Sequence, residues 1–479
     1  MNEQNLNENP VIDESHINKV FLWKVAFIAA MGGLLFGYDF MVIGGTTTFY
    51  YKFFNIMENP WLQGLSTGAA PIGCIIGAGM SMLLGDKFGR KKLLFVSAVL
   101  FLVSAIGTAM VSNYWLFNVM RLIGGGGIGL AAAMAPIYIA EMAPSSYRGK
   151  IVTTNQFTIM IGIVVSQIVN YFIQQHGEKV AEGVATAANT AMTWNETMGW
   201  RLMFGAEAIP AVGFMILIFF VPFSPRWLVK RGRNDEAEEI LKKVGGEEYA
   251  KTEVADIAST ISEEEVAKIN FKDLLEPKLM KIILLGMFLA VVQQWSGLNS
   301  IFAYSHQIFT EAGFDISGAM LSLVYQGVTM MVFCVVAMFI VDKIGRKKLM
   351  LFGALGIGII HVIMGLSFQF NFGGIAIVIL VMAAIAIYAA TLAPVVWVLL
   401  AELFPNRLRG VAMGISVMTL WVAYFILTFT FPLMSEGLGM PVTFWTYAGF
   451  LFIAFVVMKV FLPETKGKSL EQLERELVD

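Results

Sequence analysis

The stretch Asp86-Lys-Phe-Gly-Arg-Lys-Lys92 recurs almost unchanged as Asp342-Lys-Ile-Gly-Arg-Lys-Lys348, at an offset of 256 positions. A second stretch, Ala140-Glu-Met-Ala-Pro-Ser-Ser-Tyr-Arg-Gly149, recurs as Ala401-Glu-Leu-Phe-Pro-Asn-Arg-Leu-Arg-Gly410, at an offset of 261 positions. Two ordered motifs that return in the same order at nearly one period indicate that the chain consists of two equivalent halves.

The composition around these motifs is that of a membrane protein. Of the 479 residues, 57% are hydrophobic and 14% are charged, whereas soluble chains carry about 25% charged residues. The apolar residues gather in runs of about 20 residues, the length of helix that crosses a hydrocarbon core of about 30 Å. Membrane-spanning strands would instead alternate in segments of about ten residues. Twelve helical spans are predicted, at residues 22–48, 64–84, 92–112, 115–139, 151–173, 201–222, 280–309, 317–341, 348–369, 375–403, 409–432 and 442–462.

Basic residues are concentrated in the connections that follow the even-numbered spans, including both copies of the first motif, whereas the other connections hold only Lys52 and Lys179. Because cytoplasmic loops are enriched in Lys and Arg, we expect both termini in the cytoplasm and a multi-pass protein of the cell (inner or plasma) membrane. Each half then has six spans of equal topology. The expected fold class is an all-α integral membrane protein with twelve transmembrane helices, arranged as two parallel six-helix repeats.

The expected organisation has five parts. The segment between the two bundles is polar and contains helix-like charged stretches such as Asn234–Lys243. It is short for an independent domain, so we expect amphipathic helices that lie across the cytoplasmic end of the bundle. The parts are a cytoplasmic N-terminal tail at 1–21, an N-terminal six-helix bundle at 22–222, a cytoplasmic linker with short amphipathic helices at 223–278, a C-terminal six-helix bundle at 279–462 and a cytoplasmic tail at 463–479.

Two charged residues, Asp39 and Arg121, fall inside apolar spans. An ionised side chain at the centre of a membrane helix costs about 2.5–3.5 kcal/mol, so such residues need a partner or a cavity. Counted along the helices at about 1.5 Å per residue, the two lie at comparable depths, which predicts an ion pair. A carboxylate that loses its guanidinium partner in apolar surroundings takes up a proton, so the pair suits a proton switch. The alternative is a fixed salt bridge that only holds two helices together.

With these features the chain resembles the sugar porter family of the major facilitator superfamily over nearly its full length. Bacterial xylose–proton symporters and facilitative glucose transporters are the members that it resembles most. Proton symporters of this kind keep an acid at the position of Asp39. Besides the repeated motifs, the resemblance rests on Gly32-Gly-Leu-Leu-Phe-Gly-Tyr-Asp39, Arg121-Leu-Ile-Gly-Gly125, Pro136-Ile-Tyr-Ile-Ala-Glu141, Pro222-Phe-Ser-Pro-Arg-Trp227, Gln293-Gln294 with Gly297-Leu-Asn299, and Pro463-Glu-Thr-Lys-Gly467.

The resemblance also implies a set of substrate contacts. Asn and Gln suit sugar hydroxyls because each amide offers both a donor and an acceptor, and aromatic rings can cover the apolar face of a sugar ring. On a regular helix Gln294 and Asn299 lie about 140° apart, so we expect the helix to bend or unwind near Ser296-Gly297. The expected substrate-binding residues are Gln156, Gln293, Gln294, Asn299, Trp397, Trp421, Tyr304 and Phe36.

Several positions depart from the pattern of the family. Where the resemblance implies a tyrosine, an amide, or an acidic or polar residue, this chain has an apolar or bulkier side chain. The C-terminal half has therefore lost several hydroxyl-binding groups, which argues against ordinary xylose or glucose specificity and for a solute that is less polar, larger or differently shaped. These positions are Ala303, Met330, Ala389, Leu420, Tyr424 and Ile163.

The resemblance assigns the charges of the repeated motifs to gating at the cytoplasmic face. The expected ion pairs form between helices in the outward-facing state and break when the carrier opens inward. Exposed pairs contribute only about 0–1 kcal/mol each, so they can open readily. The alternative is that the charges only orient the chain in the membrane, which explains the Lys and Arg but not the acids. The expected gating residues are Glu141, Arg148, Glu402, Arg409, Asp86, Arg90, Asp342, Arg346 and Glu207.

The leading hypothesis is a secondary active transporter that couples a proton to a sugar or sugar-like polyol by alternating access. A facilitative uniporter is the first alternative, and a non-transporting sugar sensor is the second, although the C-terminal tail is short for a sensor. No catalytic triad, metal cluster or phosphate loop points to an enzyme. Apart from the proton and the bilayer, we expect no metal, cofactor or nucleic-acid partner, and we expect a functional monomer. His361, in the middle of a span, is expected to be a packing residue or a hydrogen-bond bridge.

Overall fold

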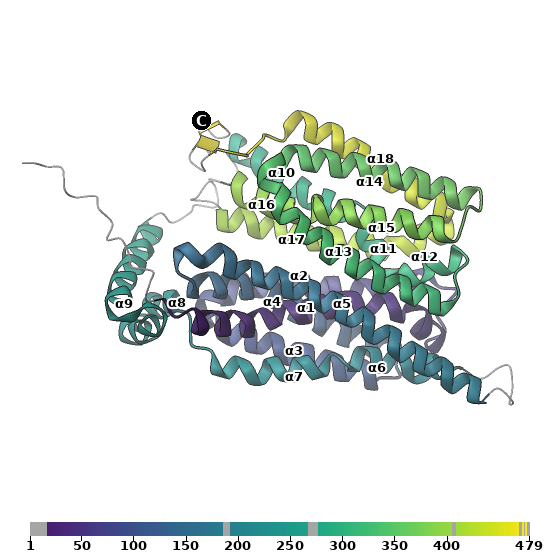
Figure 1. The fold of residues 1–479 in the computed structure, drawn as a ribbon, viewed down its shortest axis with the longest axis horizontal. Coiled ribbons are helices and arrows are strands. Elements are labelled where there is room, and N and C mark those ends of the chain that lie inside the picture. Colours follow the sequence, from purple (N-terminus) through teal and green to yellow (C-terminus); the bar gives the residue numbers. More distant parts are fainter. Residues whose placement is uncertain are drawn as a thin grey trace, which may run out of the picture.

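The computed structural model describes residues 17–184, 192–266, 276–404, 409–468, 472–473 and 475–476. Within these ranges every regular element is a helix, and twelve helices are long and apolar enough to cross a membrane. The twelve predicted spans are therefore confirmed. Figure 1 shows two bundles side by side, one formed by the first part of the chain and one by the last part.

The N-terminal half runs from α1 to α7. Its elements are α1 (Lys19–Phe53), α2 (Pro60–Phe88), α3 (Arg90–Met110), α4 (Tyr114–Met142), α5 (Ser145–Val184), α6 (Trp200–Gly205) and α7 (Ala208–Leu217). The C-terminal half has more helices because two of its spans are broken. Its elements are α10 (Pro277–Gln294), α11 (Leu298–Ala303), α12 (Ser305–Glu311), α13 (Ile316–Ile344), α14 (Arg346–Gln369), α15 (Ile375–Ala390), α16 (Leu392–Leu403), α17 (Arg409–Gly437) and α18 (Gly439–Phe461).

Glycine lets the helices of the N-terminal half approach one another closely. A Cβ on Gly37 of α1 would overlap the carbonyl oxygen of Ile159 in α5, and a Cβ on Gly162 of α5 would overlap the carbonyl oxygen of Leu34 in α1. Small residues at helix interfaces are typical of membrane proteins, where packing contacts replace the hydrophobic effect. The glycines of the Gly32–Asp39 motif thus hold α1 against α5, at the level where Asp39 lies.

The linker packs against the N-terminal half as α8 (Pro225–Lys230) and α9 (Asn234–Val266). The backbone N–H of Asn18, just before α1, donates to the carbonyl of Val244 in α9 at 2.8 Å. The Nε1 of Trp227 in α8 donates to the carbonyl of Asp86 at 3.0 Å. Figure 1 places α8, α9 and the C-terminus at one end of the bundle. We call this end the linker end and the opposite one the far end.

At the far end the two halves are in contact. Thr48 of α1 is hydrogen-bonded to His306 of α12 at 2.7 Å, and the rings of Trp61 in α2 and Phe429 in α17 are 5.2 Å apart. A Cβ on Gly44 of α1 would overlap the carbonyl oxygen of Phe302 in α11. The far ends of α1 and α2 are thus sealed against α11, α12 and α17.

Candidate transport site

A buried ion pair lies inside the N-terminal half. The Nη1 of Arg121 in α4 donates to the Oδ1 of Asp39 in α1, and the side chains are 2% and 0% exposed. The guanidinium also lies 5.0 Å from the centre of the Phe204 ring, a cation–π contact that adds to its stabilisation. The sequence predicted this pairing from the depth of the two residues, and the structure confirms that they meet.

Glu207 is a second carboxylate of the same cluster. It lies in the turn between α6 and α7, is 1% exposed, and interacts electrostatically with both Asp39 and Arg121. The expectation that it belongs with the gating charges at the cytoplasmic face is therefore wrong. Two acids and one guanidinium carry a surplus negative charge when both acids are ionised. Because an uncompensated buried charge is costly, the three groups act as one electrostatic cluster.

A small cavity of about 10 Å³ lies beside this cluster and is lined by Arg121 together with Phe40, Thr67, Cys74 and Tyr424. A cavity of this size has room for about one water molecule. The Nε of Arg121 has no hydrogen-bond partner among the described residues. Since Tyr424 belongs to α17, the cavity reaches from the ion pair to the interface with the C-terminal half.

The C-terminal half carries its polar groups at a broken helix. After Gln294 the chain leaves α10, Gly297 takes a φ of +80°, and α11 begins at Leu298. This φ favours glycine, because a side chain would be strained there. As a result the Nδ2 of Asn299 can donate to the Oε1 of Gln294. The predicted unwinding near Ser296-Gly297 is confirmed, and it brings the two amides onto one side.

Two further side chains hold this break in place. The ring Nε2 of His361 in α14 is 2.7 Å from the carbonyl oxygen of Ser296, which confirms the expected hydrogen-bond bridge. The Nε2 of Gln293 donates to the carbonyl of Ala393 at 2.8 Å. Ala393 lies at the start of α16, directly after the break between α15 and α16, so Gln293 joins the two breaks. Sequence reasoning did not foresee this second anchor.

Aromatic residues connect the two halves near these groups. The ring centres of Phe36 in α1 and Trp421 in α17 are 6.1 Å apart, and Phe40 stacks on Tyr424 with centres 5.2 Å apart. Phe40 follows Asp39 directly in the chain. A displacement of α1 at the ion pair would therefore be transmitted to α17 through ring contacts.

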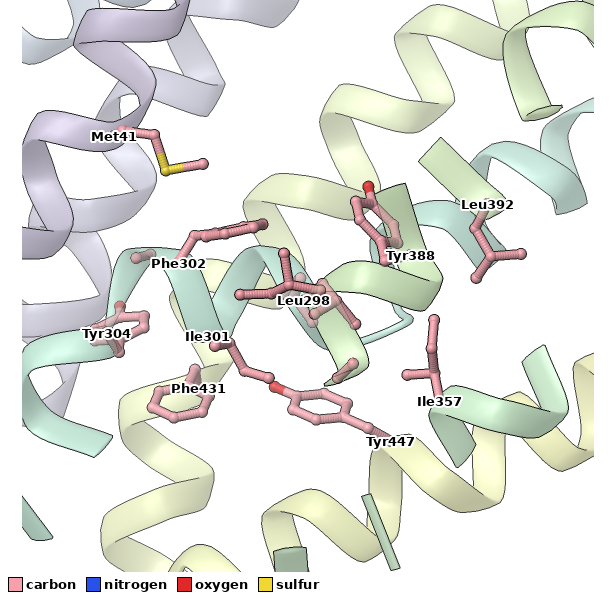
Figure 2. Close-up of a cluster of buried hydrophobic side chains, with 14 of the residues drawn as sticks. Met41, Leu298, Ile301, Phe302, Tyr304, Ile357, Tyr388, Leu392, Phe431 and Tyr447 are labelled. Carbon is pink, nitrogen blue, oxygen red and sulfur yellow. The ribbon is translucent and has the colours of Figure 1, made fainter. Parts of the chain in front are cut away.

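Tyr304, expected among the substrate-binding residues, lies in the packed interior of the C-terminal half. It is fully buried, its hydroxyl donates to the carbonyl of Thr428 at 2.7 Å, and its ring stacks on Phe431 with centres 4.6 Å apart (Figure 2). Its hydroxyl is thus already used within the C-terminal half. In this structure Tyr304 contributes to the packing of α11 against α17 and is not available to a solute.

Two of the expected solute contacts, on α5 and α16, are exposed toward the linker end, while α2 and α17 stay in contact there through Met82 and Gly414. On α5, Ile163 and Gln167 lie about 20° to either side of the line through Gln156, so the three share one face. Ile163 and Gln167 are buried, whereas Gln156, nearer the linker end, is exposed. Trp397 of α16 is 42% exposed. Gln156 and Trp397 are thus exposed in this structure, whereas Gln294 and Asn299 are buried, and the convergence of all four on one solute stays a prediction.

The repeated motifs form the same ion pairs in both halves. Arg90 pairs with Asp86 and with Glu141, each at 2.9 Å. In the C-terminal half the corresponding Arg346 pairs with Asp342 at 3.0 Å and with Glu402 at 2.9 Å.

Each of these pairs joins helices of one half. All four are intact in this structure, and none of them joins one half to the other, so their role in gating stays a prediction. Arg148 is exposed beside α9, where it opposes the rise in the pKa of Glu253 that burial and Asp256 cause. The side chain of Arg409 lies outside the described residues.

Comparison with known proteins agrees with this architecture. The family described as "Sugar (and other) transporter" matches residues 25–477. The D-xylose-proton symporter of Escherichia coli (strain K12) is 36% identical over 487 residues, covering 95% of this chain and 96% of the relative. The arabinose-proton symporter of Bacillus subtilis (strain 168) is 33% identical over 98% of both chains. The major myo-inositol transporter of the same organism is 32% identical over 95% of this chain and 94% of the relative.

Solved structures of the xylose transporter XylE from E. coli share the fold. Its inward open form has a TM-score of 0.82 at 34% identity, covering 95% of this chain and 100% of that one. The partially occluded inward open form has a TM-score of 0.81 and covers 94% of this chain. The form bound to 6-bromo-6-deoxy-D-glucose has a TM-score of 0.76 and covers 96%. The chain therefore belongs to the sugar transporter family and has the twelve-helix major facilitator fold.

Proposed function

We propose that the chain is a proton-coupled symporter of a sugar or sugar-like polyol, with its linker end in the cytoplasm. The observation that carries the proposal is the buried Asp39–Arg121 pair with Glu207 beside it. A facilitator needs no titratable cluster in its membrane core, where charged groups are costly. Two relatives named as proton symporters, of xylose and of arabinose, support the same function.

The proton step follows from the electrostatics of the pair. While Arg121 is in contact, Asp39 is held in its ionised form. When α1 and α4 shift and the contact is lost, the carboxylate is left in apolar surroundings and takes up a proton from the outer side. The neutral acid can then be buried without a partner, which permits the halves to close at the far end. At the inner side Arg121 returns and the proton leaves.

The solute step uses the C-terminal half. The amides of Gln294 and Asn299 lie together at the break of α10, and Trp421 and Phe36 provide apolar rings near it. Amide groups bind adjacent hydroxyls because they donate and accept at once. Since Phe40 follows Asp39 and stacks on Tyr424 of α17, protonation and solute binding act on the same helix contact. This contact is the basis of coupling in the proposal.

The expected driving force is substantial. One proton charge that moves inward yields about 2.3 kcal/mol per 100 mV of membrane potential. This corresponds to about fifty-fold accumulation of the solute. The solute itself is proposed only at the level of a class, a sugar or cyclic polyol, because relatives named for xylose, arabinose and myo-inositol match over nearly the whole chain. Replaced positions such as Ala303 and Leu420 argue against ordinary xylose within this class.

The test is uptake into proteoliposomes. Purified protein is first screened by thermal shift with D-xylose, L-arabinose and myo-inositol, and uptake of the best ligand is then measured with and without an inward proton gradient. The proposal expects accumulation above the external concentration that collapses on adding a protonophore. Equilibration without accumulation, unaffected by the gradient, would establish a uniporter instead.

A further inference from the structure

The interface between α5 and α13, which we call the seam, contains two glutamines of α5 that differ in their hydrogen bonding. The Nε2 of Gln175, near the far end, donates to the Oγ of Ser317 at the start of α13. Gln167, two turns nearer the middle of the membrane, is 1% exposed, and neither its Oε1 nor its Nε2 has a hydrogen-bond partner among the described residues. One amide is thus satisfied across the seam, and the other is buried without a partner.

Gly327 of α13 makes room for this buried amide. A Cβ on Gly327 would overlap the Oε1 of Gln167, so only glycine lets the amide fit between the helices in this state. The preceding residue in the chain, Gln326, has an Nε2 that also lacks a partner among the described residues, while its Oε1 accepts from Ser305 at 2.9 Å. Donors and acceptors on both helices therefore remain unsatisfied at this level of the seam.

Burial of an unpaired primary amide is unfavourable, because its hydrogen bonds to water are lost without replacement. An apolar side chain such as the neighbouring Ile163 or Val164 would avoid this loss and would fill the same space. Buried groups without partners are few in native proteins, and each requires an explanation. Since the amide destabilises the state in which it is sealed, its role belongs to a state in which it is open.

The position of Gln167 indicates which state this is. Gln167 shares one face of α5 with Gln156, and it lies about 16 Å further toward the far end, at about 1.5 Å per residue. Gln156 is exposed, whereas Gln167 is closed off by α13. A carrier that opens alternately to its two sides must separate α5 from α13 at the far end in its other state. That separation would free Gln167 from Gly327 and turn it toward the outer opening.

We propose that Gln167 is a solute-binding residue of the outward-facing state, where its amide binds hydroxyls of the sugar or polyol. The proposal rests on the function proposed above and deepens it. When the halves close at the far end, the amide withdraws behind Gly327 and its contact with the solute is lost. Gln167 thus raises affinity on the outer side only, which favours capture outside and release inside.

The test compares the two faces of the membrane with D-xylose, L-arabinose and myo-inositol as probes. KM is measured for influx and for efflux in vesicles of known orientation, for wild type, Gln167→Leu, Gln167→Asn and the control Gln175→Leu. Gln167→Leu is expected to raise the KM at the outer face about tenfold, as expected for a lost hydrogen bond to a ligand. The KM and maximal rate for efflux stay near wild type, and the maximal rate for influx rises with its KM, because without a gradient the ratio of maximal rate to KM must be equal in both directions. Gln167→Asn keeps an amide and restores part of the outer affinity, and Gln175→Leu leaves both KM values unchanged.

Each other outcome overturns the proposal. Equal KM changes at both faces, no change at either face, or a fall in maximal rate alone would assign Gln167 a structural role. Thermal stability of Gln167→Leu in detergent, expected to equal or exceed that of wild type, shows that the variant is folded. If wild type transports none of the three probes, the proposed function fails together with this inference. If wild type transports one and Gln167→Leu is indistinguishable from it, only this inference fails.

Discussion

The two halves of the molecule place different chemistry at equivalent positions of the repeat. In the N-terminal half, spans one and four are the continuous helices α1 and α4, and they carry Asp39 and Arg121. The corresponding spans seven and ten of the C-terminal half are broken, after Gln294 and after Ala390. Among the described residues, both halves bury amides, but every buried Asp, Glu, Lys or Arg belongs to the N-terminal half and both buried histidines belong to the C-terminal half.

This difference indicates a division of labour. Continuous helices satisfy their own backbone, so they can hold a charge pair in a dry environment. Broken helices expose backbone groups, which is tolerated in a membrane only where the chain is buried in protein or lines a cavity. The break at Gly297 therefore suits a polar solute site, and the unbroken pair α1–α4 suits a proton site. Coupling between the two then depends on the contacts of Phe36 and Phe40 with α17.

The largest effect is expected from breaking the charge pair. Arg121→Leu removes the opposite charge, so Asp39 must either stay ionised without a partner or take up a proton, and breaking a buried pair costs about 3–5 kcal/mol. We expect a large drop in thermal stability in detergent. The matched change in the other half, Gln294→Leu, removes only an amide hydrogen bond and costs about 1 kcal/mol.

A second variant makes this comparison sharper. Asp39→Asn combined with Arg121→Leu removes both charges, so it should be more stable than Arg121→Leu alone. If the single variant melted like wild type, or if Gln294→Leu cost as much, the contrast between the halves would not be electrostatic.

An intermediate effect is expected at the helix break. Gly297→Ala places a side chain at a φ of +80° and against Tyr447 and His361, and the left-handed conformation alone costs about 1–2 kcal/mol. We expect a lower melting temperature and a higher KM for the solute. Gly126→Ala is the control in the continuous helix α4, where a Cβ meets only Leu100 at 3.7 Å.

The change in stability of the control variant should have the opposite sign. Alanine in a helix interior is more favourable than glycine by about 0.5–1 kcal/mol, so Gly126→Ala should be as stable as wild type or more stable. A Gly297→Ala protein with unchanged KM and melting temperature would show that the break does not position the solute amides.

The smallest effects are expected where the halves are alike. Glu402 is 22% exposed and pairs with Arg346, whereas Glu141 is 9% exposed and pairs with Arg90. Because exposed pairs contribute little, Glu402→Gln should change the free energy of unfolding by less than about 1 kcal/mol. Glu141→Gln should cost somewhat more, since Glu141 is more buried and also accepts from Ser224 at 2.5 Å. Thermal denaturation of both variants measures the difference, and a reversed order would contradict it.

Much of this arrangement could be predicted from the sequence because it follows from length, period and depth. Hydrophobic runs gave the twelve spans, and counting residues along them placed Asp39 level with Arg121. The angle between Gln294 and Asn299 required an unwound segment, and Gly297 provides it. In each of these cases one helical rule was sufficient.

The residues that were misplaced depend on tertiary contacts. Glu207 lies in a turn between α6 and α7, so counting along a regular span does not give its depth. Tyr304 could not be assigned to packing without its partner Phe431, which lies 127 positions away in the chain. Gln167 was overlooked because it lies next to apolar residues of α5, and its unpaired amide becomes visible only when Gly327 is placed opposite.

Proton coupling in the proposed mechanism depends most on Asp39 as the group that carries the proton. The direct measurement is transport by Asp39→Asn in proteoliposomes, with accumulation and solute exchange determined on the same preparation. Asparagine resembles the protonated acid in shape but cannot release a proton. We expect Asp39→Asn to exchange solute across the membrane at a rate near wild type, while accumulation of solute against its gradient is abolished. A variant that still concentrates the solute under a proton gradient would contradict this role of Asp39.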